Sequence, residues 1–196
     1  MTTKEFLQIG FWTLVARVLG AGLMFFMTIL FARWLGAEDF GLFSLGLAIM
    51  SITGVLARWG TDQLLLKNVG MHCETEPEIA KGYAISSIQL VLIISSIIAI
   101  LVYILSESIA THIFNKPEFS EVLSWFGIMI ILVSINYTIA ESYKGAGKPV
   151  LSSYLQNVIV PLITILLGSI FYYLEKINLI SATQSLASGA LVALIV

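Results

Sequence analysis

The sequence predicts an all-α, polytopic membrane protein, a bundle of six transmembrane helices. Of its 196 residues, 58% are hydrophobic and only 11% are charged, whereas an average soluble domain has about 25% charged residues. The mean hydropathy is +0.96. A soluble domain of this size keeps a large surface in water, so its core has no room for so many apolar side chains. Lipid is therefore the expected solvent.

Long runs without charge mark the expected spans, because a helix needs about 20 apolar residues to cross the hydrocarbon core. Such runs cover residues 82–106, 122–140 and 149–174, and another begins at Ile177. Two further apolar stretches near the N-terminus contain ionised side chains. No stretch alternates as the strands of a membrane barrel do, so helices are expected throughout. The expected spans are residues 9–35, 40–66, 82–106, 120–143, 149–174 and 177–196.

Short polar segments connect these spans. Residues 36–39 join the first two spans, and residues 68–81 form the longest connection. Pro117 breaks the helical pattern in the third connection. The segment Lys144–Pro149 contains a glycine that can stop one helix and a proline that can open the next.

The sixth apolar run follows a turn that we expect at Glu175 and Lys176. This run reaches Val196 with no polar cap, basic tail or helix-stop signal. We therefore expect residues 1–196 to form a single transmembrane lobe, truncated at its C-terminus, of a longer transporter.

The basic residues in the connections and near the span ends indicate the orientation, because cytoplasmic connections carry more lysine and arginine than external ones. A cytoplasmic N-terminus places five of them inside and three outside, which favours that orientation. The inner residues are Lys4, Lys67, Lys81, Lys144 and Lys148, and the outer ones are Arg33, Lys116 and Lys176.

Three ionised side chains within the expected spans are the main functional candidates, because an ion near the bilayer centre costs about 2.5–3.5 kcal/mol on the insertion scale. Arg17 can hold a phosphate through two parallel hydrogen bonds. A salt bridge between helices, or snorkelling to the interface, explains it equally well. Arg58 and Asp62 share one face of the second span. Either they neutralise each other, or Asp62 pairs with Arg17 and leaves Arg58 for a substrate.

Uncharged polar residues within the spans are weaker candidates for the lining of a wet cavity. Thr61 and Gln63 flank Asp62 and make that stretch the most polar in any span, which favours a cavity over lipid contact. Hydrogen bonds between helices explain the remaining ones as readily. These are Gln89, Asn136, Gln156 and Asn157.

Three further features concern helix shape and packing. Pro161 should kink the fifth span, and gating is the functional interpretation of that kink. Ala16 and Gly20 have the small-x-x-x-small spacing that predicts close helix packing. Glu141 and Lys144 are interpreted as a solvated pair at the membrane interface.

The sequence contains no set of residues typical of an enzyme or a metal site. His72 and His112 are isolated in connections, and the lone Cys73 excludes an internal disulfide. There is no Walker loop, no serine–histidine–acid set, no zinc spacing and no basic block for nucleic acid. We expect no enzymatic activity, cofactor, metal or nucleic-acid partner, so any transport is secondary or needs a separate motor.

Four motifs resemble the polysaccharide-repeat flippases, which export O-antigen and exopolysaccharide units. They are Ala16–Gly20, Ala32–Leu45, Arg58–Asp62 with Lys67–Asn68, and Tyr143–Pro149. The second motif is the most specific. The family belongs to a superfamily that also contains multidrug-and-toxin extruders and lipid II flippases. Its members have twelve to fourteen spans in two lobes, so this chain resembles the N-terminal lobe alone.

The resemblance implies a transporter that moves polyprenyl-diphosphate-linked oligosaccharide across the cytoplasmic (inner) membrane of a prokaryote by alternating access. Arg17 and Arg58 would contact the diphosphate. The implied partners are membrane lipid, the lipid-linked oligosaccharide, the missing C-terminal lobe and the polysaccharide polymerase machinery. Two alternatives stay open. One is a cation-coupled drug or metabolite antiporter with Asp62 as the coupling residue, and the other is a non-transporting six-span protein.

Overall fold

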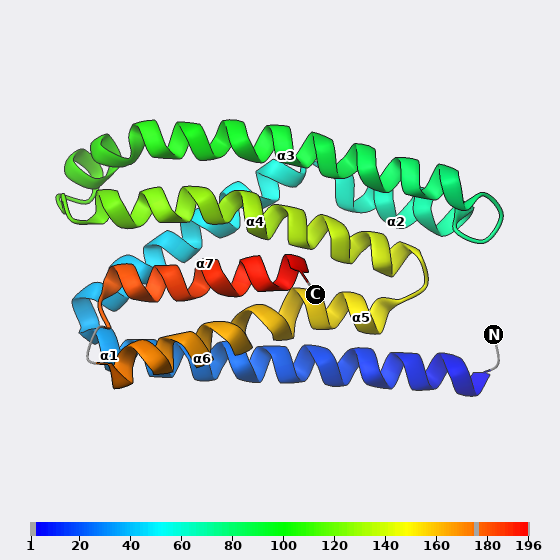
Figure 1. Ribbon diagram of the computed structural model, residues 1–196, viewed down its shortest axis with the longest axis horizontal. Coiled ribbons are helices and arrows are strands. Elements are labelled where there is room, and N and C mark those ends of the chain that lie inside the picture. The colour runs from blue at the N-terminus through cyan, green and yellow to red at the C-terminus, as the bar shows by residue number, and fades with distance from the viewer. Residues whose placement is uncertain (1–2, 175–176, 196) are drawn as a thin grey trace.

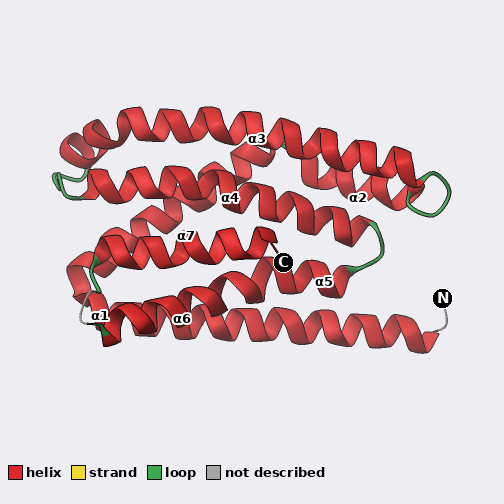
Figure 2. Ribbon diagram, in the orientation of Figure 1, coloured by secondary structure: helices red, strands yellow, loops and turns green. Residues whose placement is uncertain are grey.

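The computed structural model describes residues 3–174 and 177–195, and helices take up nearly all of them (Figures 1 and 2). No strand occurs within these ranges, so the predicted all-α membrane fold is confirmed. Within the same ranges, four helices are long and apolar enough to cross a membrane, and Leu179–Ile195 is a shorter apolar helix. One of the four, Lys4–Arg58, contains the first expected span and most of the second. The count of six spans stays a prediction.

Helix α1 (Thr3–Arg58) reverses direction at Gly36. This glycine has φ 79° and ψ 175°, a region that essentially only glycine adopts. Figure 1 shows the chain turning back at this point. The rings of Phe31 and Phe43 stack with centroids 5.4 Å apart, whereas a straight helix would separate residues at this spacing by about 18 Å. The connection expected at residues 36–39 is therefore a sharp reversal.

The second expected span, residues 40–66, is not one continuous helix. Helix α1 ends at Arg58, and α2 (Thr61–His72) begins after two residues with left-handed conformations, Trp59 (φ 39°) and Gly60 (φ 81°). Glycine accepts this conformation without a side-chain clash and is a common residue just past a helix end. The break places Arg58 at the end of one helix and Asp62 in the first turn of the next.

The rest of the chain runs back and forth in antiparallel helices (Figure 1). The first two are α3 with the π-helical turn η1, and then α4. The third is the irregular helix α5–η2–α6, and α7 returns along it. Their bounds are α3 Pro77–Ser108, η1 Ile109–Ile113, α4 Phe119–Gly145, α5 Pro149–Tyr154, η2 Leu155–Ile159, α6 Val160–Tyr173 and α7 Leu179–Ile195. The turn expected at Glu175 and Lys176 lies outside the described residues.

The fifth expected span is distorted just before Pro161. Proline has no N–H to donate to the carbonyl of Asn157 four residues earlier, and its ring would collide with that carbonyl in a regular helix. The chain forms the π-helical turn Leu155–Ile159 at this point, which is one of the recognised causes of helix distortion. The predicted irregularity therefore takes the form of a π-turn.

Helix α4 is the centre of the bundle and contributes much of the hydrophobic core. Phe126 of α4 and Phe31 and Phe43 of α1 are almost completely buried. The rings of Phe43 and Phe126 lie 6.0 Å apart and join the two helices. Large apolar side chains on the outside of α1, such as Phe25, remain exposed, as expected for a surface in lipid.

The connections lie at two opposite ends of the bundle (Figure 1). The N-terminus and the α2–α3 and α4–α5 connections share one end, and the reversal at Gly36 and the η1–α4 connection share the other. At this second end Lys116 donates a hydrogen bond to Glu38. That bond and the charge of Lys116 lower the pKa of the Glu38 carboxyl, while Glu38 raises the pKa of Lys116. The pair links two connections that are far apart in sequence.

Candidate functional site

A cavity of about 470 Å³ lies among α1, α4, η2, α6 and α7. The structure brings together there seven of the residues singled out from the sequence, from four different segments. They are Arg17, Gly20, Arg58, Asn136, Gln156, Asn157 and Pro161. Two polar residues that were not singled out also line it. They are Ser51 and Tyr137.

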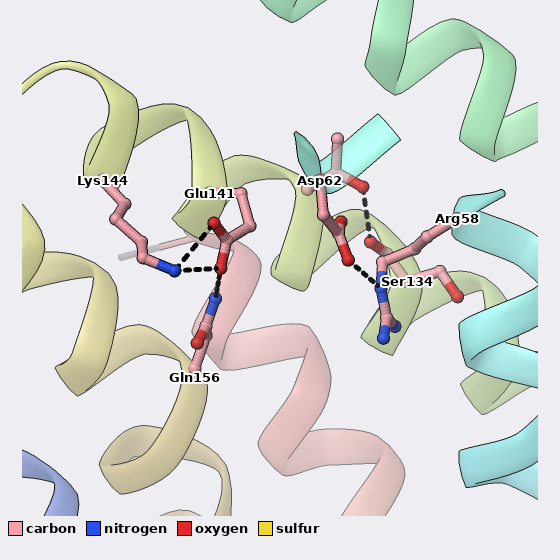
Figure 3. A network of polar contacts seen from close by, with 7 residues as sticks. Arg58, Asp62, Ser134, Glu141, Lys144 and Gln156 are labelled. Atoms are coloured by element: carbon pink, nitrogen blue, oxygen red, sulfur yellow. Dashed lines mark hydrogen bonds and ion pairs between the residues drawn. The ribbon is translucent and has the colours of Figure 1, made fainter. Parts of the chain in front are cut away.

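Arg58 is held in place by two neighbours at the break between α1 and α2. Its Nε donates a hydrogen bond to Asp62 Oδ2 at 3.1 Å, drawn in Figure 3. Its Cζ lies 4.6 Å from the centre of the Tyr137 ring, within the range of a cation–π contact. Of the two alternatives for Asp62, the structure therefore has the pair with Arg58. The two terminal Nη groups make no hydrogen bond within the described part of the chain, so they can bind a ligand.

Arg17 differs from Arg58 because it is exposed and makes no salt bridge with another described residue, so snorkelling of its side chain toward the interface stays an open alternative. Its side chain lines the same cavity, and none of the salt bridges between described residues includes it. The alternative of a salt bridge between helices is thus not realised within residues 3–174 and 177–195. A guanidinium stays charged at any physiological pH. Arg17 therefore leaves one positive charge in the cavity for an anion to neutralise.

Close contact between α1 and η2 sets the width of the cavity beside Arg17. Ala16 is fully buried, and a Cβ added at Gly20 would lie 2.5 Å from Asn157 Cβ. The close packing predicted from the spacing of Ala16 and Gly20 is therefore confirmed. Without a side chain at Gly20, the backbone of η2 can approach α1 and present Asn157 to the cavity.

The interpretation of Glu141 and Lys144 as a solvated pair is wrong. Glu141 is only 9% exposed, and its side chain reaches from α4 to Gln156 of η2. Its carboxylate accepts hydrogen bonds from Lys144 Nζ at 3.1 Å and from Gln156 Nε2 at 2.9 Å (Figure 3). Gln156 connects this buried carboxylate to the cavity wall. The sequence shows Glu141 at the end of one expected span and Gln156 in the next. It does not show that these two side chains meet.

The other predicted polar residues do not line the cavity. Gln63 and Gln89 are exposed on the outside of α2 and α3. Thr61 is 3% exposed, and its Oγ1 has no hydrogen-bond partner. The second carboxylate oxygen of Asp62, Oδ1, and Ser134 Oγ are likewise buried without a partner. The polar stretch around Asp62 is thus partly sealed inside the protein.

The chain was compared with known proteins and protein families. The model of the family described as polysaccharide biosynthesis protein matches residues 6–196. The chain belongs to this family. No curated protein and no solved structure matches it. This member of the family is an all-α membrane protein, with two arginines in a cavity between its helices.

Proposed function

We propose that this polysaccharide biosynthesis protein is one lobe of a flippase for polyprenyl-diphosphate-linked oligosaccharide. The observation that carries the proposal is that Arg17 and Arg58 line one cavity among the apolar helices, and that no salt bridge between described residues includes Arg17. Guanidinium groups bind phosphate oxygens through paired, charge-assisted hydrogen bonds. A diphosphate would supply the negative charge that the cavity lacks.

Charge also favours an anionic cargo over a cationic one. Asp62 is engaged by Arg58, and Glu141 is engaged by Lys144. Among the described residues that line the cavity there is no aspartate or glutamate. A carrier for cations would need a carboxylate facing its cargo, so the antiporter alternative has less support than the flippase.

In the proposed mechanism no covalent bond changes, and no enzymatic step or cofactor is needed. The diphosphate head group enters the cavity while the polyprenyl chain stays in lipid. A second, C-terminal lobe then rocks against this one and opens the cavity to the other side of the membrane. We place the protein in the inner membrane of a prokaryote, with its N-terminus in the cytoplasm. The polysaccharide polymerase machinery would act on the delivered repeat.

The test replaces Arg17 in the full-length protein, in cells that lack any other copy. Arg17→Ala should abolish surface polysaccharide while the amount of protein in the membrane is unchanged, and Arg17→Lys should retain part of the export because the charge remains. Arg33→Ala is the matched control, since Arg33 does not line the cavity. Normal export by Arg17→Ala would refute the role assigned to the cavity.

A further inference from the structure

We infer that the π-turn Leu155–Ile159 is a subsite for the first sugar of the lipid-linked oligosaccharide. There, the amide oxygens of Gln156 and Asn157 accept hydrogen bonds from hydroxyl or amide N–H groups of that sugar. This inference rests on the proposed function and names the part of the cargo that these side chains recognise. Three observations carry it.

The first observation is the orientation of Gln156, which Glu141 imposes. A carboxylate only accepts hydrogen bonds, so the amide of Gln156 must turn its nitrogen toward Glu141, as it does at 2.9 Å (Figure 3). If the amide were flipped by 180°, Gln156 Oε1 would face a carboxylate oxygen of Glu141, and neither atom can donate a hydrogen bond. Lys144 holds the carboxylate from its other side. Gln156 Oε1 therefore remains an acceptor, on a side chain that lines the cavity.

The second observation concerns Asn157, whose amide is also held by its nitrogen, here by a backbone carbonyl. Its Nδ2 donates to the backbone carbonyl of Ser153 at 3.0 Å. A carbonyl oxygen also only accepts, so this bond fixes which end of the amide is the nitrogen, and Oδ1 has no hydrogen-bond partner among the described residues. The contact with Gly20 fixes the backbone at this point. Each of the two neighbouring amides thus has one N–H engaged and an acceptor oxygen with no hydrogen-bond partner among the described residues, on a side chain that lines the cavity.

The third observation is the division of the cavity by hydrogen-bonding chemistry. Arg17 and Arg58 can only donate, and phosphate oxygens can only accept, so the diphosphate belongs beside the arginines. The oxygens of Gln156 and Asn157 would repel a phosphate, and the buried charge of Glu141 lies behind Gln156. The matching partner is a neutral group rich in hydrogen-bond donors. In the proposed cargo, the sugar bonded to the diphosphate has that character.

The experiment measures binding to the full-length protein in lipid nanodiscs with two probes. One probe is polyprenyl diphosphate, and the other is polyprenyl-diphospho-N-acetylglucosamine, which adds only the sugar. Gln156→Met keeps the length of the side chain and removes the acceptor. It should raise the Kd for the sugar-bearing probe about three- to tenfold, the effect of one hydrogen bond, and leave the Kd for polyprenyl diphosphate unchanged.

Two controls accompany this variant. Gln89→Met makes the same replacement on the outside of α3 and should change neither Kd. Binding of polyprenyl diphosphate reports whether each variant is folded. Should Gln156→Met not fold, Gln156→Asn keeps the amide but draws it back by one methylene, and it should show the same loss for the sugar-bearing probe alone.

The outcomes separate this inference from the proposed function. An equal loss for both probes, or no loss for either, overturns the sugar subsite and leaves the flippase proposal standing. The same holds if the unmodified protein binds the two probes equally well. If the unmodified protein binds neither probe, both proposals are wrong.

Discussion

Arg17 and Arg58 show two ways of keeping a guanidinium inside a membrane protein. Arg58 has a carboxylate on one side and an aromatic ring on the other, so most of its charge is balanced by the protein. Arg17 lines the cavity with no such partner among the described residues. We expect Arg58 to position the cargo and Arg17 to contribute more to its binding, since an unpaired cation gains most from an incoming anion.

Ser134 provides a test of the sealed polar region near Arg58. Its Oγ is buried without a hydrogen-bond partner, and an unsatisfied buried group costs about 1–3 kcal/mol. Ser134→Ala should therefore leave stability unchanged or raise it by about 1 kcal/mol. Thr138→Ala, one turn later, removes a buried hydroxyl that donates to the Ser134 carbonyl, so it should lower stability by about 1 kcal/mol. Thermal unfolding in detergent measures both, and a marked loss in Ser134→Ala would show that the hydroxyl has a partner.

The pair of Arg58 and Asp62 should behave as a unit. The two side chains are 12% and 35% exposed, so removing one partner leaves a poorly solvated charge. Asp62→Leu should lower stability by about 1–3 kcal/mol, less than for a fully buried pair. Arg58→Met combined with Asp62→Leu should recover most of this loss, because it removes both charges. A double-mutant cycle of unfolding free energies measures the coupling, and additive losses would mean that the pair contributes nothing.

Whether a functional residue can be recognised from the sequence depends on the residues that precede and follow it. Arg17 and Arg58 stand out because an ion within an apolar run is unusual. Glu141 does not, because it ends such a run and looks like any solvated acid near the interface. Its burial depends on Gln156 of another helix, and no local pattern reveals that contact. The sequence predicts the cationic part of the cavity and misses the buried carboxylate behind it.

At the scale of the helices, the reversal at Gly36 depends on one backbone conformation. Nothing lies within 4 Å of a Cβ added there, so Gly36→Ala has no steric neighbour and its effect comes from the backbone alone. We expect a loss of about 1–3 kcal/mol. Gly41→Ala, in the helix that follows, also meets nothing within 4 Å and should be neutral or stabilising. Thermal unfolding of the two variants side by side distinguishes backbone strain from a general effect of alanine.

The contact of α1 with η2 offers a second matched pair. Gly20→Ala would drive a methyl group into Asn157, and overpacking of this kind costs about 1–3 kcal/mol. Gly22→Ala adds the same methyl group where nothing lies within 4 Å. We expect only the first change to lower the unfolding temperature and to impair export. Equal effects of both would contradict the close packing of the two helices.

Helix breaks are harder to predict than helices. A glycine followed by two acidic residues after an apolar run marks the reversal at Gly36. The break at Trp59 and Gly60 is harder to recognise. The polar stretch around it is interpreted from the sequence as the lining of a cavity within one span, and a single glycine is tolerated within a membrane helix. Pro161 indicates a distortion but does not specify its form. The π-turn packs against α1 and α4, two helices that lie elsewhere in the sequence.

For the whole molecule, the two ends of the bundle make the proposed orientation testable. Cys73, the only cysteine, lies between α2 and α3 at the end that holds the N-terminus. With that end in the cytoplasm, a membrane-impermeant maleimide should label Cys73 only after the cells are permeabilised. Glu118→Cys in a Cys73→Ser background lies at the opposite end and should react in intact cells. The reverse pattern would place the N-terminus outside.

The π-turn also constrains how the length of this chain can vary. A π-helical turn contains one residue more than the α-helical turn that it replaces. Deleting any one residue of Leu155–Ile159 would leave only enough residues for a regular α-helical turn. In a regular helix the ring of Pro161 would collide with the carbonyl four residues earlier, a clash that costs about 3 kcal/mol or more. We therefore expect homologous chains to vary in residue type at this turn far more readily than in residue number.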